Sequence, residues 1–154
     1  CESINEFFDL LDVARIRDTS YGRNEYMKKV SAKDAETYGK VTIWHQQDPG
    51  VGGKDAAEAT NRLLMGYPVF YETVSGSKES RSEDMESGFQ GKLIKLIEGA
   101  WNDAFIDECV AFTGDDKGHD DQVDAGSSAY HKLLSMIGAF RKSRVYGSSA
   151  NLQM

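Results

Sequence analysis

Short apolar segments with strand character alternate along this chain with longer segments of helical periodicity. The strand-like segments are residues 7–16, 41–45, 68–74 and 93–97. The segments with helical spacing are residues 24–38, 54–65, 82–89, 100–112 and 121–142. Strands that alternate with helices bury a sheet beneath helices, because each element has an apolar face that needs a partner. The order of segments therefore predicts an α/β fold.

The length and composition fit one domain with its own core. The chain has 154 residues, of which 40% are hydrophobic and 28% are charged, as in ordinary globular proteins. We expect a domain over residues 1–143 and a C-terminal tail over residues 144–154. The two cysteines are too few for a disulfide framework, which favours an intracellular protein. No apolar segment approaches the roughly 20 residues that cross a bilayer, so we expect no membrane partner.

The net charge limits the classes of function. The chain has 18 basic and 25 acidic residues, which gives a net charge of −7. A domain that binds nucleic acid alone and without specificity is normally basic, so the charge argues against this class. A nuclease stays compatible with the charge, because an acidic site can contact DNA through bound metal ions.

An acidic cluster stands at the start of the longest helical segment. The sequence Gly-His-Asp-Asp-Gln-Val-Asp-Ala occupies residues 118–125, and it contains the adjacent Asp120 and Asp121. Carboxylates at a helix start are stabilised by the helix dipole and can cap free amides. They are also the oxygen ligands that Mg²⁺ prefers. A helix cap with a solvated acidic turn is the simpler interpretation of such a pair.

Apolar residues follow this cluster at helical spacing. They are Val123, Tyr130, Leu133, Leu134 and Ile137. We expect this face to bury the last helix against the sheet.

Three stretches occur in order along the chain. They are Val-Thr-Ile-Trp-His-Gln-Gln-Asp-Pro-Gly at residues 41–50, Trp-Asn-Asp-Ala-Phe-Ile-Asp-Glu at residues 101–108, and the acidic cluster at residues 118–125. Together they resemble the nuclease domain of the terminase large subunit of tailed bacteriophages, over about residues 7–134. The resemblance implies a ribonuclease-H-like mixed sheet flanked by helices. It also implies N-terminal truncation, because the family's first catalytic strand has no counterpart here.

The resemblance also implies an activity. The nuclease of this family is a metal-dependent endonuclease, which cleaves the phosphodiester bonds of concatemeric DNA by a two-metal mechanism with Mg²⁺ or Mn²⁺. The implied partners are double-stranded DNA, the terminase ATPase domain, the small terminase subunit and the portal. A virus-encoded protein of this kind acts in the host cytoplasm.

Three acidic residues receive catalytic and metal-binding roles from the resemblance. Asp120 and Asp121 match the family's helix-start motif. Asp48 is the candidate for the middle strand, because Gln46 stands where many members have Glu, and a neutral amide is a weaker metal ligand. Asp48 lies two residues further along, on the same side of an extended strand. The alternative is that Asp48 only forms a turn before Pro49.

Four further residues are candidates for contact with DNA. They are His119, Lys54, Lys78 and Arg81. Lys54 follows a glycine-rich turn that lacks the pattern of a phosphate-binding loop. For each of the four, a position in a solvated loop or tight turn is the alternative.

Two other functions stay open. A catalytically silent terminase fragment, which only contacts DNA or packaging proteins, is favoured by Gln46 and by the absent first-strand acid. Asp12 does not replace that acid, because its spacing to Trp44 matches the family's third strand. A resolvase-type nuclease is the third possibility, and residues 44–54 argue against it.

Overall fold

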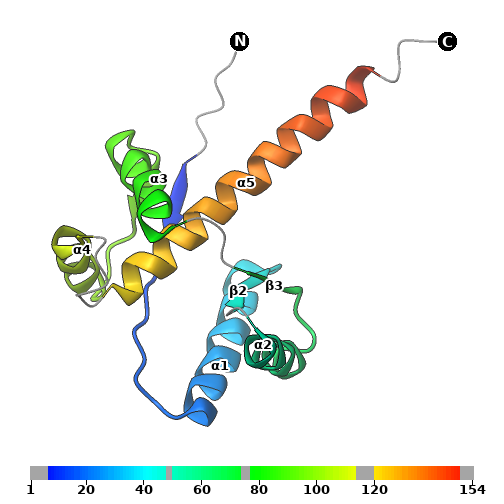
Figure 1. Cartoon of the computed structure of the whole chain (residues 1–154), viewed down its shortest axis with the longest axis vertical. Coiled ribbons are helices and arrows are strands. Elements are labelled where there is room, and N and C mark those ends of the chain that lie inside the picture. The colour runs from blue at the N-terminus through cyan, green and yellow to red at the C-terminus, as the bar shows by residue number, and fades with distance from the viewer. Residues whose placement is uncertain (1–6, 48–49, 74–76, 114–119, 150–154) are drawn as a thin grey trace. The chain divides into compact units, whose positions relative to one another are not determined.

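A computed structural model describes residues 7–47, 50–73, 77–113 and 120–149 of the chain (Figure 1). Every predicted segment contains an element of the expected type, so the α/β class is confirmed. The strands are β1 (Phe8–Leu10), β2 (Ile43–Gln47), β3 (Val69–Thr73) and β4 (Ile94–Leu96). The helices are α1 (Ser20–Tyr38), α2 (Val51–Leu63), α3 (Lys78–Gln90), α4 (Asn102–Ala111) and α5 (Asp121–Ser149). Within the described residues, no helix is long and apolar enough to cross a membrane.

Several boundaries differ from those that the periodicity predicted: α1 begins at Ser20 and α2 at Val51, before residues 24 and 54, and β1 is much shorter than residues 7–16. The Oγ of Ser77 accepts a hydrogen bond from the backbone N–H of Ser80 at 3.2 Å, and α3 therefore begins at Lys78. A capped amide needs no other partner, which stabilises a helix start at that position. At the other end of the chain, α5 continues to Ser149 instead of ending near residue 142, so part of the expected tail is helical.

The chain divides into two compact units. The first unit consists of Cys1–Arg15 and Gly76–Met154, and the second consists of Ile16–Ser75. In the first unit β1 pairs with β4, and in the second β2 pairs with β3, both in parallel. In each unit the described strands thus form a parallel two-stranded sheet.

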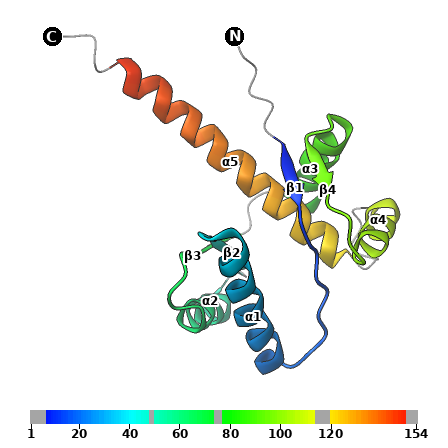
Figure 2. The same ribbon diagram turned by 180° about the vertical axis from the view of Figure 1, so that it is seen from behind.

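The core of the first unit lies where α3, α4 and the two strands cover the first half of α5 (Figures 1 and 2). It consists of Met85, Phe105, Val123 and Tyr130, each at most 6% exposed. The ring of Tyr130 meets that of Phe8 edge-on, with centroids 5.0 Å apart. A Cβ added at Gly88 of α3 would come within 2.7 Å of the Tyr130 ring. The absence of a side chain at Gly88 therefore permits the close approach of α3 to α5.

The second half of α5 extends beyond α3 and α4 (Figures 1 and 2). Val123 and Tyr130 are buried as predicted, but Leu133 and Leu134 are 44% and 36% exposed. The expected burial is therefore wrong for the two leucines. Helical spacing identifies a common face, but burial of that face ends where the covering elements end.

The second unit is built around a strand–helix–strand connection. Helix α2 joins the parallel strands β2 and β3 and packs against them, as a parallel pair requires a crossover. The Nε2 of His45 in β2 lies 3.1 Å from the Oδ1 of Asn61 in α2. The ring of Trp44 stacks on that of Phe70, with centroids 4.7 Å apart. Since neighbouring side chains of a strand point to opposite faces, this aromatic pair lies on the face away from α2.

We expect the stability of the first unit to depend on the Phe105 side chain, which is 1% exposed. Phe105→Ala should lower the free energy of unfolding by about 3–5 kcal/mol, because it removes buried surface and leaves a cavity. Val110→Ala on the same helix is the matched control, since Val110 is 82% exposed and its change should stay within about 0.5 kcal/mol. Urea unfolding followed by circular dichroism measures both. Equal losses would contradict this assignment of the core.

Candidate active site

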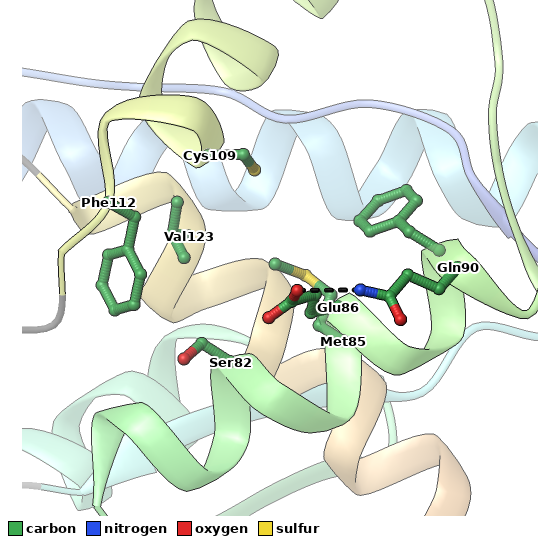
Figure 3. A pocket seen from close by; sticks show the side chains of 8 residues that line it. Ser82, Met85, Glu86, Gln90, Cys109, Phe112 and Val123 are labelled. Carbon is green, nitrogen blue, oxygen red and sulfur yellow. Dashed lines mark hydrogen bonds between the residues drawn. The ribbon is translucent and has the colours of Figure 1, made fainter.

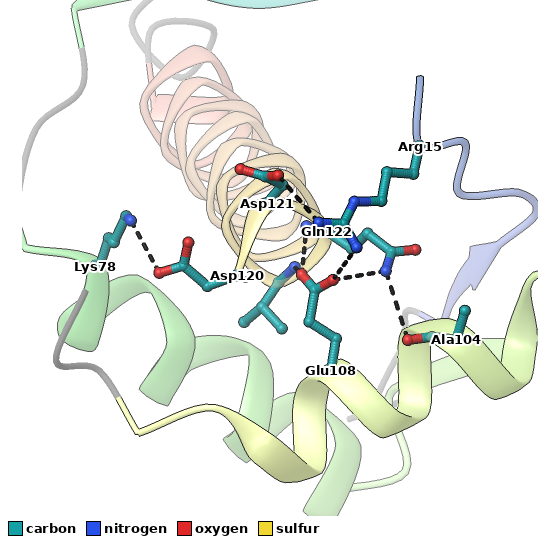
Figure 4. Close-up of polar contacts among 8 residues, drawn as sticks. Arg15, Lys78, Ala104, Glu108, Asp120, Asp121 and Gln122 are labelled. Carbon is teal, nitrogen blue, oxygen red and sulfur yellow. Dashed lines mark hydrogen bonds and ion pairs between the residues drawn. The ribbon is translucent and has the colours of Figure 1, made fainter. Parts of the chain in front are cut away.

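Three acidic residues gather at the start of α5 in the first unit, and Figure 4 shows two of them, Asp120 and Asp121. Asp120 precedes the helix, Asp121 is its first residue, and Asp124 lies in its first turn. The backbone N–H of Asp124 donates to the carbonyl oxygen of Asp120 at 2.8 Å and closes this turn. The positive end of the helix dipole reduces the repulsion among the carboxylates.

Each of these carboxylates faces a basic side chain from another segment. The Nζ of Lys78 lies 2.9 Å from the Oδ2 of Asp120, and the guanidinium of Arg81 pairs with the carboxylate of Asp124. Both basic residues belong to α3. The third pair is looser, with 3.6 Å between the Nη2 of Arg15 and the Oδ2 of Asp121 (Figure 4).

Exposure separates the acidic residues into two kinds. The Asp121 side chain is 75% exposed, whereas those of Asp120 and Asp124 are 16% and 23% exposed. Arg81, the partner of Asp124, is 6% exposed, so this ion pair is part of the contact between α3 and α5. Asp121 therefore offers its oxygens to solvent and to ligands, while Asp124 holds the two helices together.

A fourth carboxylate reaches the same helix start from α4. One side-chain oxygen of Glu108, Oε1, accepts hydrogen bonds from the backbone N–H groups of Gln122 and Val123, at 2.6 and 3.1 Å. The other, Oε2, accepts one from the Nε2 of Gln122 at 2.7 Å. Since the first amides of a helix have no partner within it, Glu108 acts as the N-terminal cap of α5 (Figure 4).

A cavity of about 350 Å³ opens among α3, α4 and the start of α5 (Figure 3). Met85, Cys109, Phe112 and Val123 form part of its lining, and Ser82 adds a hydroxyl group. Burial, followed by the negative charge of Glu108, raises the pKa of the Cys109 thiol to about 11. Cys109 is thus a protonated thiol at neutral pH, and it does not supply a nucleophile to this cavity.

The residues predicted for the site fall in different parts of the chain. Asp48 and His119 lie outside the described residues, so their predicted roles stay predictions. Lys54 is an exposed residue of α2 in the second unit. Lys78 and Arg81 were predicted to contact DNA, and in this structure both pair with acidic residues at the start of α5.

The described carboxylates fit part of a metal site. Asp120 and Asp121 are adjacent oxygen donors of the kind that hard divalent cations prefer. However, the parts of the chain that the structure describes contain no group of three or more His, Cys, Asp or Glu side chains able to hold a metal ion. A metal site here would need at least one further ligand, and Asp48, outside the described residues, stays the prediction from the sequence.

Two residues of this site had no predicted role. Glu108 is the last residue of the stretch 101–108, which carries part of the family resemblance. It is a buried acid beside the apolar stripe of α4 that contains Phe105 and Cys109. A charged residue that is buried needs a buried partner. An acid next to an apolar helical stripe is therefore a sequence signal for such a contact. Arg15 has no comparable signal, because its contacts to Glu108 and Asp121 depend on the tertiary fold.

Comparison with known families gives one match. A family model described as "Terminase RNaseH-like domain" matches residues 11–133, which include the start of α5 and both predicted Asp residues there. The match confirms the predicted family and its ribonuclease-H-like fold class. No curated protein and no solved structure matches the chain.

The different environments of the acidic residues predict different effects on stability. Asp124→Ala should lower the free energy of unfolding by about 2–3 kcal/mol, because it leaves the buried Arg81 charge without this carboxylate; this range lies below that of fully buried pairs, since Asp124 is 23% exposed. Asp121→Ala should cost less than about 1 kcal/mol, since an exposed ion pair and the helix dipole contribute little. Urea unfolding of both variants is the measurement, and a larger loss for Asp121→Ala would contradict the assigned roles.

Proposed function

The chain belongs to the terminase RNaseH-like domain family, and from this we propose that it is the endonuclease domain of a viral DNA-packaging terminase. Its substrate is then concatemeric double-stranded DNA, whose phosphodiester bonds it hydrolyses. The observation that carries the proposal is the family match over residues 11–133, together with adjacent carboxylates at the start of α5.

The proposed cofactor is Mg²⁺ or Mn²⁺, with Asp120, Asp121 and Asp48 as its ligands. When bound, such ions supply an activated water and stabilise the leaving oxygen. Asp121 suits this role because its side chain is 75% exposed and its ion pair with Arg15 is loose, at 3.6 Å. Asp120 is more enclosed, and Lys78 neutralises its charge at 2.9 Å. Lys78 thus reduces the electrostatic repulsion between the adjacent carboxylates of Asp120 and Asp121.

We assign contact with the DNA backbone to Lys54, Lys78 and His119. The Lys78 side chain is 34% exposed beside Asp120, so a phosphate near the acidic pair would meet a positive charge. Arg81 takes a different role in this proposal, because a side chain that is 6% exposed and paired with Asp124 has little surface for DNA. Nothing in the three sequence stretches resembles an element that reads bases, so cleavage should not depend on sequence.

The proposed partners follow from the packaging role. They are the terminase ATPase domain, the small terminase subunit and the portal, and the proposed location is the cytoplasm of a bacterium infected by a tailed bacteriophage. The net charge of −7 supports the need for such partners, since a basic surface elsewhere must supply most of the affinity for DNA.

A catalytically silent domain is the second candidate function. One observation favours it: the neutral Gln46 stands in β2, where many members of the family have Glu. In this alternative the domain only contacts DNA or packaging proteins. Metal-dependent cleavage distinguishes the two candidates.

We expect cleavage of plasmid DNA by the full-length terminase to require Mg²⁺ or Mn²⁺ and to be nearly abolished by Asp121→Asn. The substitution keeps the size of the side chain but removes the charge that attracts the cation. Asp103→Asn is the matched control, because Asp103 is an exposed acid in the first turn of α4. Agarose gel assays with each metal and with EDTA measure the effect. Cleavage that survives Asp121→Asn would exclude Asp121 from catalysis.

The middle-strand ligand has its own test. Asp48→Asn should reduce cleavage as strongly as Asp121→Asn, whereas Gln46→Ala should have little effect, because only an ionised carboxylate binds the cation strongly. The same plasmid assay, together with Mn²⁺ binding measured by calorimetry, compares the two variants. The reverse order of effects would identify Gln46 as the residue that matters in β2.

A further inference from the structure

We infer that Glu108 is a positioning residue, whose buried carboxylate caps α5 and thereby orients Asp120 and Asp121 for the metal ion. The inference rests on the proposed function, because it concerns the same acidic pair. It adds a residue from α4, which holds the site without contacting metal or DNA.

The contact is specific to the first amides of α5. Oε1 of Glu108 accepts from the N–H groups of Gln122 and Val123, at 2.6 and 3.1 Å. The Gln122 side chain adds a second connection, because its Nε2 donates to Oε2 of Glu108 at 2.7 Å and lies 3.5 Å from the carbonyl oxygen of Ala104. Figure 4 shows these groups converging between α4 and α5. The start of α5 is therefore tied to one turn of α4.

The hydrogen bonds to Glu108 also restrict the acidic pair, because they act through the backbone of α5. The N–H of Gln122 belongs to the peptide group that begins at the carbonyl of Asp121. Because a peptide group is planar and rigid, a hydrogen bond to that N–H also restricts the orientation of Asp121. Asp120 is restricted in turn, since its carbonyl oxygen accepts from the N–H of Asp124 at 2.8 Å.

Glu108 itself is unsuited to bind metal. Its side chain is 6% exposed, and its two oxygens accept three hydrogen bonds from residues 122 and 123. The Nη1 of Arg15 lies 3.9 Å from Oε2 on the remaining side. A carboxylate has about four acceptor positions, so these partners occupy nearly all of them.

The test uses Glu108→Gln in the full-length protein. Glutamine keeps the size of the side chain, but it removes the negative charge and places an NH₂ group where Oε2 accepts a hydrogen bond. A double variant, Glu108→Gln with Gln122→Glu, exchanges the two groups and restores a charge-assisted hydrogen bond between positions 108 and 122. Met85→Ala is the control for lost stability, because Met85 is a core residue 5% exposed and makes no part of the cap.

Two measurements distinguish positioning from general stabilisation. Hydrogen exchange at the amides of Gln122 and Val123 reports the cap without metal, and these amides should lose protection in Glu108→Gln. Mn²⁺ titration followed by electron paramagnetic resonance reports the acidic pair, and affinity should fall about tenfold, as when a group that orients a metal ligand is removed. The double variant should recover much of that loss, whereas Met85→Ala should lower the melting temperature and keep the affinity.

The outcomes separate this inference from the proposed function. Unchanged Mn²⁺ affinity in Glu108→Gln, with binding in the wild type, overturns the positioning role alone. An equal loss of affinity in Met85→Ala also overturns it, because the effect would then follow stability. A wild-type protein that binds no Mn²⁺ overturns the metal site of the proposed function, and the positioning role falls with it.

Discussion

A buried carboxylate at the N-terminus of α5 is the interaction on which the first unit depends. Glu108 brings a negative charge into the protein interior, where an ionised group needs hydrogen bonds or an opposite charge. The amides at the start of α5 supply these bonds, and they are the groups of a helix that most need an acceptor. The same charge contributes to the raised pKa of Cys109. The contact between α4 and α5 thus satisfies both partners and fixes the end of the helix that carries the acidic cluster.

The acidic residues around this contact divide by environment and not by position in the sequence. Asp124 and Glu108 have enclosed partners and hold helices together, whereas Asp121 is open to solvent. Asp120 lies between these cases, because it is mostly enclosed but borders the open Asp121. Some of the 25 acidic residues are therefore committed to internal contacts. Only the exposed oxygens of the cluster are accessible to the proposed cation, and these lie at Asp121 and at the edge of Asp120.

Periodicity and motif order were sufficient to predict the elements, the α/β class and the family. They were insufficient for features that depend on which elements meet. The pairing of the strands in two parallel sheets is one example, because apolar runs do not specify their partners. The exposure of Leu133 and Leu134 is another, since helical spacing does not reveal where the covering helices end. The contacts of Lys78 and Glu108 with the start of α5 join residues far apart in the sequence, and neither was predicted.

The parallel pairing of β1 with β4 has a consequence for how the chain acquires its structure. Phe8 is paired with Ile94, and the whole second unit lies between them in the sequence. The second unit can form from neighbouring segments as soon as they leave the ribosome, because β2, α2 and β3 are consecutive. The first unit must wait, since β1 has no partner strand until β4 has been synthesised. Closing such a long loop opposes the pairing through chain entropy and slows folding. Prior folding of the second unit shortens the flexible loop, so the inserted unit would act as an aid to the assembly of the unit that surrounds it.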